Sequence, residues 1–378
     1  MRISCVATGL GIVAVVACRI LALAAVGGTA LASANAAQSD APRVENARLE
    51  TRALAAPLAD ELKNWAAGSS QPQWIGYTVP QVAGNRKVCC NYNGSWNQGC
   101  GTCSLESGDR GSSIHSHDDG TVKLEGPRVL AILFRAENNK ITKLRLVSTE
   151  CTLDAGGLPF VWLTGVKPAE SVALLSGYVR GENFDEHGDN RPGHEALTAI
   201  ALHADESADR VLESFVRPDE REQLRKQTAF WLGEARGRAG FVALQKMAKS
   251  DPSSDVRGHI AFALSVSGEP GAIDEMIRMA HDDESGHVRG QALFWLAQKA
   301  GQKAVGAITG AIENDPDTEV KKKAVFALSQ MPKDEGVPKL IQVAQTNRNP
   351  AVRKQAMFWL GQSNDPRALE FFEKVLSQ

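Results

Sequence analysis

A repeat of 32 residues runs without a slip from Leu224 to Gln378. In each of its five units a basic residue occupies the second place, phenylalanine follows five places later, and leucine comes two places after that. The basic column is Arg225, Arg257, Arg289, Lys321 and Arg353, the phenylalanine column is Phe230, Phe262, Phe294, Phe326 and Phe358, and the leucine column is Leu232, Leu264, Leu296, Leu328 and Leu360. Such strict register predicts a solenoid, in which each unit packs only against its neighbours.

Each unit carries two apolar stripes at helical spacing. In the second unit the first stripe is Val256, Ile260, Ala263 and Leu264, which falls on one helix face. The second stripe begins, in successive units, at Phe241, Ile273, Val305 and Val337. Breaks rich in glycine and proline, such as residues 267–271 and 331–335, separate the stripes and end helices. Each unit is therefore predicted to be a helix, a turn and a second helix.

The links between units share a column of aspartate or asparagine. This column is Asp251, Asp283, Asp315 and Asn347, five places before the valine that opens the next helix. An Asp or Asn side chain accepts backbone N–H bonds and caps the following helix, and proline fits the first helical turn. We also expect this column to hydrogen-bond the basic column of neighbouring units and to form a ladder.

The segments "DPSSDVRGHIAFAL" and "NPAVRKQAMFWLGQ" resemble HEAT repeats of the short bacterial kind that phycobilin lyases also contain. The resemblance covers residues 224–378 and extends weakly upstream through residues 195–203 and 209–216, so that 194–223 is expected to be a degenerate capping repeat. It implies an α-solenoid. The tryptophans Trp231, Trp295 and Trp359 alternate with alanine in one column, which favours packing between units over an exposed recognition strip.

The N-terminus has the features of a secretory signal. Residues 1–36 contain no acidic residue, two arginines, a long apolar run and a small-residue site at Ala34-Asn35-Ala36. An uncleaved anchor stays open because the run is nearly long enough to span a bilayer. The chain is expected to be periplasmic or otherwise exported, without membrane insertion after cleavage. Its formal charge, −2 before cleavage and −4 without Arg2 and Arg19, argues against nucleic acid as the main partner.

Residues 37–72 are polar and alanine-rich and are expected to form a flexible leader with one short helix. A small β-rich domain is predicted over 73–180, followed by a linker over 181–193. Strands are predicted over 74–79, 86–89, 121–124, 129–135, 141–147 and 160–163, with a hairpin turn over 137–140, a tight turn over 154–157 and a helix over 168–178. The fold class is thus α+β and multidomain, with an all-α HEAT-like solenoid after a β-rich domain that contains cysteines.

The five cysteines after the signal all lie in the β-rich domain. They are Cys89, Cys90, Cys100, Cys103 and Cys151, and in an exported protein they are disulfide candidates. Their connectivity stays open. The alternative is zinc or another soft metal held by Cys89, Cys100, Cys103, His115 and His117, because thiolates and imidazoles suit such ions. Redox chemistry at Cys89, Cys90, Cys100 and Cys103 belongs to the same alternative.

The repeats alone do not indicate catalysis. Deoxyhypusine hydroxylases place His-Glu pairs on successive repeats to hold iron, whereas this chain has one such pair, His194-Glu195. Phycobilin lyases bind a tetrapyrrole, from which an exported protein would be separated. The chain is therefore expected to be a scaffold without enzymatic activity or cofactor, whose solenoid binds a protein or peptide. Outward positions of the second helices would form the surface: Lys246, Asp274, Glu275, Arg278, Lys339, Gln342, Glu370 and Lys374, with Lys246, Arg278, Lys339, Gln342 and Lys374 as the binding residues.

Overall fold

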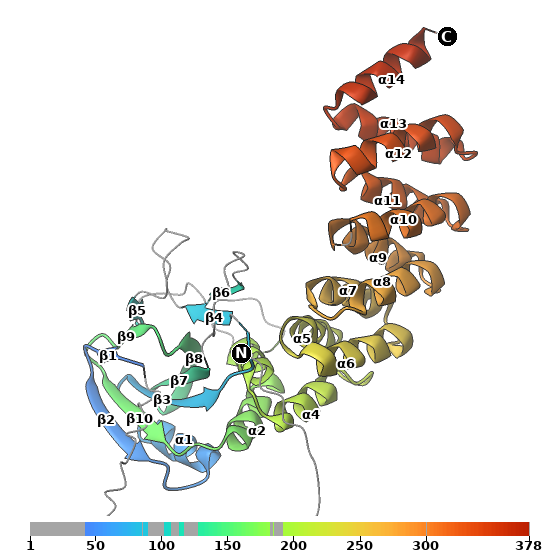
Figure 1. Ribbon diagram of the computed structural model, residues 1–378. Helices are drawn as coiled ribbons and strands as arrows, with labels where there is room; N and C mark the ends of the chain where they lie inside the picture. The colour runs from blue at the N-terminus through green and yellow to red at the C-terminus, as the bar shows by residue number, and fades with distance from the viewer. Residues whose placement is uncertain are drawn as a thin grey trace, which may run out of the picture. The chain divides into compact units, whose positions relative to one another are not determined.

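The computed structural model describes residues 42–84, 86–89, 102–106, 113–116, 128–181, 184, 192–299 and 301–377. Figure 1 shows strands in the first part of this region and helices in the rest. The expected signal segment, the predicted strand over 121–124, and Cys90, Cys100 and His117 lie outside the described residues. Within the described residues the order of elements is that of the predicted α+β class.

A mixed five-stranded sheet forms the centre of the N-terminal part. Its strand order is β2-β10-β3-β7-β8, with β2 (Arg48–Ala53), β10 (Pro159–Thr164), β3 (Gln73–Pro80), β7 (Val129–Glu137) and β8 (Lys140–Ser148). The first three strands are parallel to one another, and β3, β7 and β8 are antiparallel. Asn138 and Asn139 join β7 to β8 at φ of 51° and 61°, and asparagine tolerates this left-handed conformation in hairpin turns. The predicted hairpin is confirmed.

Both faces of this sheet are buried at its central strands, where successive side chains point to opposite sides and enter two different cores. Along β7, Ile132 and Phe134 belong to one core, and Ala131 and Leu133 belong to another. The first core includes α1 (Leu58–Ala67) and α2 (Pro168–Val179). The second includes the three-stranded sheet of β1 (Val44–Glu45), β9 (Thr152–Asp154) and β5 (Thr102–Ser104). A separate pair is formed by β4 (Arg86–Cys89) and β6 (Ser113–Ser116).

The prediction of a flexible leader over residues 37–72 is wrong at β2, which is a strand of the sheet. This strand pairs with β10 along six residues, from Arg48 opposite Pro159 to Ala53 opposite Thr164. All six of its side chains are exposed, because β2 lies at the edge of the sheet. Its sequence therefore lacks the alternation of apolar and polar residues that marks a half-buried strand. The short helix expected in this region is α1.

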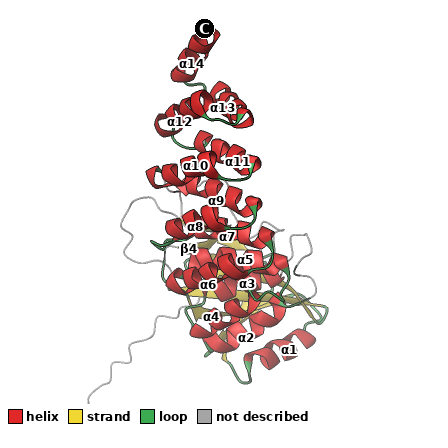
Figure 2. Cartoon of the chain, turned by 90° about the vertical axis from the view of Figure 1, so that its right-hand side faces the viewer, coloured by secondary structure: helices red, strands yellow, loops and turns green. Residues whose placement is uncertain are grey.

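The remaining chain is a series of helices in two layers. The helices are α3 (Pro192–Leu202), α4 (Glu206–Phe215), α5 (Glu222–Ala235), α6 (Gly237–Ser250), α7 (Ser254–Val266), α8 (Ala272–Asp282), α9 (Gly286–Lys299), α10 (Gln302–Asn314), α11 (Thr318–Ser329), α12 (Lys333–Thr346), α13 (Pro350–Gln362) and α14 (Pro366–Leu376). The odd-numbered helices α5 to α13 contact one another in succession and form the first-helix layer. The even-numbered helices form the second-helix layer, and Figure 2 shows the two stacks side by side. The predicted repeat of two helices is confirmed.

The sheet and the first helices share one hydrophobic core. The core that contains Ile132 and Phe134 continues through α2 and α3 into the solenoid helices. The backbone adds two bonds, Val82 N–H to Leu202 O and Ala204 N–H to Pro80 O, both 2.9 Å. Phe184, in the segment expected to be a linker, is buried in the same core and stacks on His194 with ring centroids 4.6 Å apart. The predicted linker over 181–193 is therefore fixed to the core at Phe184.

Candidate binding face

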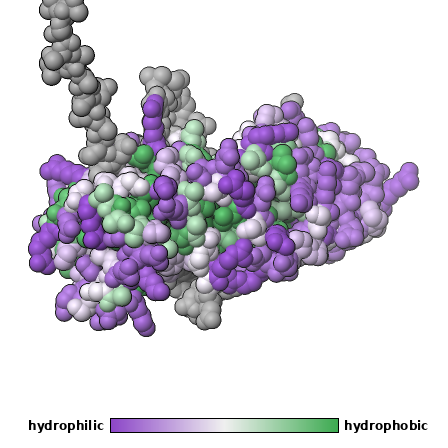
Figure 3. All heavy atoms as spheres, turned by 90° about the horizontal axis from the view of Figure 1, so that it is seen from below, coloured by the Kyte–Doolittle hydropathy of each residue, from purple (hydrophilic) through white to green (hydrophobic). Residues whose placement is uncertain are grey.

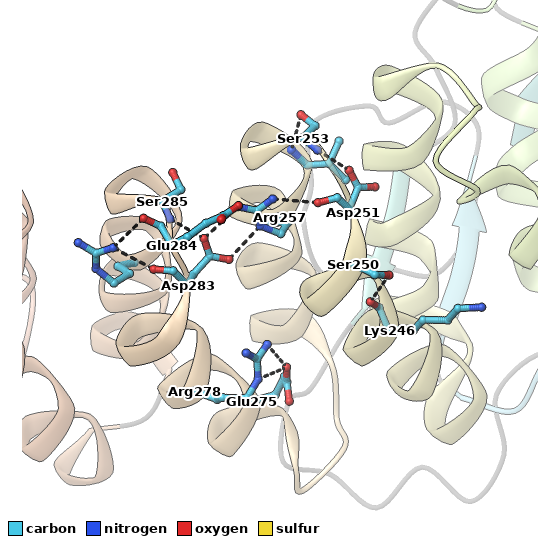
Figure 4. Close-up of polar contacts among 12 residues, drawn as sticks. Lys246, Ser250, Asp251, Ser253, Arg257, Glu275, Arg278, Asp283, Glu284 and Ser285 are labelled. Carbon is cyan, nitrogen blue, oxygen red and sulfur yellow. Dashed lines mark hydrogen bonds and ion pairs between the residues drawn. The ribbon is translucent and has the colours of Figure 1, made fainter.

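An ion-pair ladder runs along the links between repeats, as predicted. Arg257 donates from Nε and Nη2 to the carboxylate of Asp283 at 2.9 and 3.1 Å, and from Nη1 to the carbonyl of Asp251 at 2.9 Å. Arg289 repeats this pattern one unit later with Asp315 and the carbonyl of Asp283. Figure 4 shows Arg257 between the two links. The hydrogen bonds that these two guanidinium groups donate to Asp283 and Asp315 raise their pKa, so both arginines stay charged within the ladder.

The aspartate column turns the links but does not cap the following helices. Asp251 Oδ1 accepts the backbone N–H of Ser253 at 2.9 Å, two residues on. The N-cap of α7 is Ser253 itself, whose hydroxyl accepts from Val256 N–H. Asp317 and Asn349 cap α11 and α13 in the same place. The predicted capping position was therefore two residues too early, because each column side chain accepts the backbone N–H of the residue two places on, which itself precedes the helix.

One rung of the ladder differs chemically from the others. At that rung Lys321 stands for arginine and Asn347 for aspartate, so the second member carries no charge. The Nζ of Lys321 donates to the carbonyl of Glu313 at 2.8 Å, and the amide of Asn347 lies 3.5 Å from the carbonyl of Ile312. The structure gives the Lys321–Asn347 rung no ion pair, and Arg353 donates to the carbonyl of Asn347 at 2.8 Å, whereas the links before α9 and α11 contain ion pairs.

The aromatic columns of the first-helix layer pack between units. Phe230 stacks on Phe262 with centroids 5.7 Å apart, and Phe294 stacks on Phe326 at 5.9 Å. The ring centroids of Trp295 and Phe262 lie 4.7 Å apart, and the three tryptophans of the column pack against the core. Phe358, in the last unit, is 53% exposed. Packing is therefore the main role of this layer, as expected for the tryptophans.

The predicted binding residues lie on the second helices but do not converge on one site. Lys246 on α6, Gln342 on α12 and Lys374 on α14 are exposed, and Lys339 on α12 is half-buried. Figure 4 shows the Lys246 side chain pointing away from the other labelled residues. Figure 3 shows one face of the molecule, on which hydrophilic residues are interspersed with hydrophobic ones.

Arg278 and Glu275 form a pair that the repeat pattern did not reveal. Glu275 is 5% exposed, so its assignment as an outward residue was wrong. Its Oε1 accepts from Arg278 Nε at 2.8 Å and Nη2 at 2.5 Å, and its Oε2 accepts from Gln245 at 3.3 Å. Arg278 neutralises a buried carboxylate. A charge reversal there would damage the fold, which makes Arg278 a poor probe of partner binding.

A groove of about 580 Å³ separates α8 from α10. The α10 wall consists of small residues, Gly306, Ala307, Gly310 and Ala311, and Ile277 and His281 of α8 face them. A Cβ atom on Gly306 or Gly310 would meet nothing within 4 Å. Glycine inside a helix costs about 1 kcal/mol relative to alanine, and here the packing of the described residues does not require it. The sequence signal was two Gly-Ala pairs four residues apart.

A second groove of about 510 Å³ separates α4 from α6. It is lined by apolar side chains and by three exposed cations, among other residues: Arg210, Arg217, Lys246, Val216, Val242, Ala243 and Met247. Of this set, only Lys246 was predicted from the sequence. Val242 lies outside the apolar stripe of its helix, and an apolar residue in that position was the available signal.

Two stretches of the solenoid, residues 208–297 and 307–378, match the HEAT-repeat family. These stretches are HEAT repeats. A human deoxyhypusine hydroxylase structure is similar at 15% identity and a TM-score of 0.26, covering 55% of this chain and 90% of that one. Kap121p is similar at 14% identity and a TM-score of 0.36, covering 55% and 27%. The CpcE–CpcF complex of phycocyanin lyase from Nostoc sp. is similar at 18% identity and a TM-score of 0.30, covering 55% and 81%.

A search of curated proteins found no match to the chain. Among the described helices, none combines the length and the apolar character needed to cross a membrane.

Next to the HEAT repeats, three buried side chains form a hydrogen-bonded chain. Tyr77 O–H lies 2.9 Å from Ser171 Oγ, which lies 3.0 Å from His203 Nε2, and His203 Nδ1 lies 2.6 Å from Ala199 O. The carbonyl requires a proton on Nδ1, so Nε2 accepts from the serine. Burial lowers the pKa of His203 to about 4 and raises the pKa of Tyr77. A serine beside a histidine suggests nucleophilic chemistry, but no substrate reaches these fully buried groups.

The structure does not describe most side chains of the predicted disulfide or metal site in the β-rich part. Cys103 is buried on β5, and Cys89 and His115 are described only as backbone of β4 and β6. Cys151 is a buried thiol whose Sγ lies 3.8 Å from the carbonyl of Val88. This thiol does not fit its assignment as a disulfide candidate. Among the described residues, no group of three His, Cys, Asp or Glu side chains is placed to hold a metal ion.

Proposed function

We propose that this chain is an exported scaffold that binds a protein or peptide through the second-helix layer of its HEAT repeats and carries out no catalysis. The HEAT fold supports the proposal because it is typical of protein-binding scaffolds. Export rests on the features of residues 1–36.

The groove between α8 and α10 carries the proposal. Gly306 and Gly310 weaken α10, and the space beside them is open. Some other glycines of the solenoid have an internal reason, such as Gly233, where a Cβ would lie 2.1 Å from the carbonyl of Ala263, whereas Gly361 of α13 is also open. A partner backbone that packs against α10 would explain the two glycines, because their lack of side chains permits close approach.

The test fills this groove without disturbing the core. Partners captured by the purified wild-type protein from an extract of exported proteins are identified by mass spectrometry, purified, and titrated against the variant Gly306→Leu/Gly310→Leu. We expect binding to be lost, because leucine side chains occupy the groove while remaining good helix formers. The matched control is Lys303→Leu, an exposed position of the same helix outside the groove. Equal affinity of both variants for every purified partner would exclude this groove as the site.

A further inference from the structure

The groove between α4 and α6 has an apolar floor in contact with solvent. Val216 follows α4, and Val242, Ala243 and Met247 are contributed by α6. Val242 is 52% exposed, which makes it one of the few large apolar side chains of the described residues that are open to water. Apolar side chains in a recess of this size favour a ligand that carries an apolar side chain of its own.

The rim of the same groove has an excess of positive charge. Arg210, Arg217 and Lys246 are exposed around it. Of the two carboxylates in the lining, Asp251 is already neutralised, because Arg225 donates to both of its oxygens at 2.9 and 3.1 Å. The other carboxylate, Glu213, can balance only one of the three cations. The rim therefore keeps an excess of positive charge, although the formal charge of the whole chain is −2.

These cations are available to a ligand. No carboxylate among the described residues forms an ion pair with Arg210 or Lys246, and Arg217 reaches only Asp219, at 3.4 Å, with both side chains exposed. The groove between α8 and α10 differs in this respect, since its lining contains neither lysine nor arginine. The two grooves of the second-helix layer therefore select different chemistry.

We infer that the groove between α4 and α6 binds a peptide segment in which an apolar side chain is flanked by carboxylates. The apolar side chain enters beside Val242 and Met247, and the carboxylates pair with Arg210, Arg217 and Lys246. Opposite charges across an interface accelerate association and exclude like-charged competitors, whereas apolar burial supplies most of the affinity. This inference rests on the proposed scaffold function and adds the chemistry of one partner.

A fluorescent peptide with a central Leu-Phe pair flanked by glutamates is the probe, and the same peptide flanked by lysines is its counterpart. Fluorescence anisotropy with the purified full chain measures both. We expect saturable binding of the acidic peptide, weakened by added salt, and no binding of the basic one. The variant Arg210→Glu/Lys246→Glu should weaken binding at least about tenfold, because two attractions become repulsions worth roughly 1.4 kcal/mol together.

Matched variants separate charge from shape. Val242→Ala should weaken the acidic peptide several-fold without unfolding α6, because Val242 is exposed and alanine favours helix. Lys299→Glu, an exposed charge reversal on α9, should leave the affinity unchanged. Equal binding of both peptides, or insensitivity to Arg210→Glu/Lys246→Glu, would overturn the inference. So would binding of anionic lipid vesicles, but not of the peptide, through the same two cations.

The inference and the scaffold function fail separately. If partners still require the open space at Gly306 and Gly310 while the acidic peptide does not bind, the scaffold function stands and the chemistry assigned to the α4–α6 groove is wrong. If the acidic peptide binds and Gly306→Leu/Gly310→Leu changes no partner, the second groove is the binding site and the first is not.

Discussion

Replacing Gly306 and Gly310 by alanine should stabilise the protein. Both glycines lie inside α10, and a Cβ atom on either would meet nothing within 4 Å. Each substitution therefore gains the helix propensity of alanine without a clash, about 1 kcal/mol each and about 2 kcal/mol for the pair. The gain arises from the lower backbone entropy of the unfolded chain, so it requires no new contact in the folded state.

The assay is urea unfolding followed by circular dichroism, with fluorescence of the solenoid tryptophans as a second probe. Repeat arrays often unfold in more than one step. The comparison is therefore made on the transition that contains α10, identified as the one that Gly306→Ala shifts. We expect this transition to move to higher urea without a change in slope.

The matched controls are glycines of the same solenoid that are in tight contact. At Gly233 a Cβ would lie 2.1 Å from the carbonyl of Ala263, and at Gly336 it would lie 2.3 Å from the carbonyl of Leu328. Alanine at either position forces the helices apart and should destabilise by about 1–3 kcal/mol. Destabilisation by Gly306→Ala/Gly310→Ala would refute the reasoning, because it would mean that the space beside α10 is needed by the fold.

Three further predictions concern the scaffold. Asp315→Ala should lower the free energy of unfolding by about 3 kcal/mol, since it leaves Arg289 buried without its carboxylate, whereas Asp282→Ala at an exposed site should have little effect in the same urea titration. The double variant Lys321→Arg/Asn347→Asp should restore a charged rung. Its gain in the free energy of unfolding should exceed the sum of the gains of the two single variants by about 1 kcal/mol, and additive gains would contradict this. Stability should fall as pH drops from about 6.5 to about 4, because the unfolded chain binds a proton there that folded His203 does not; this contribution reaches about 3 kcal/mol, and His203→Gln should remove it from the pH profile.

Much of the solenoid follows from the sequence because its contacts are local and repeat. The spacing of 32 residues places Arg257 and Asp283 in equivalent positions in every unit, so one chemical argument applied to one column predicts a ladder along the array. The hairpin at Asn138 and Asn139 was predictable for a similar reason, since its turn conformation depends on adjacent residues.

The candidate site was predictable only in part. The sequence places Lys246 and Gln342 on the second helices, but it does not show that Arg278 is engaged by a buried Glu275. That pair depends on how deeply α8 packs against its neighbours, which periodicity does not report. The grooves depend on the distance between successive second helices, a property of several units together.

The sequence by itself determined the repeat, its helix pairs and the ion-pair ladder, because these depend on residues in fixed register. Only the tertiary structure decided that β2 belongs to the sheet, since an edge strand with every side chain in solvent has no apolar pattern. It also decided that Tyr77, Ser171 and His203 join the sheet to the first helices, and that open grooves separate α4 from α6 and α8 from α10. Each of these features needs segments that are distant in sequence to meet, and no local pattern encodes where they do.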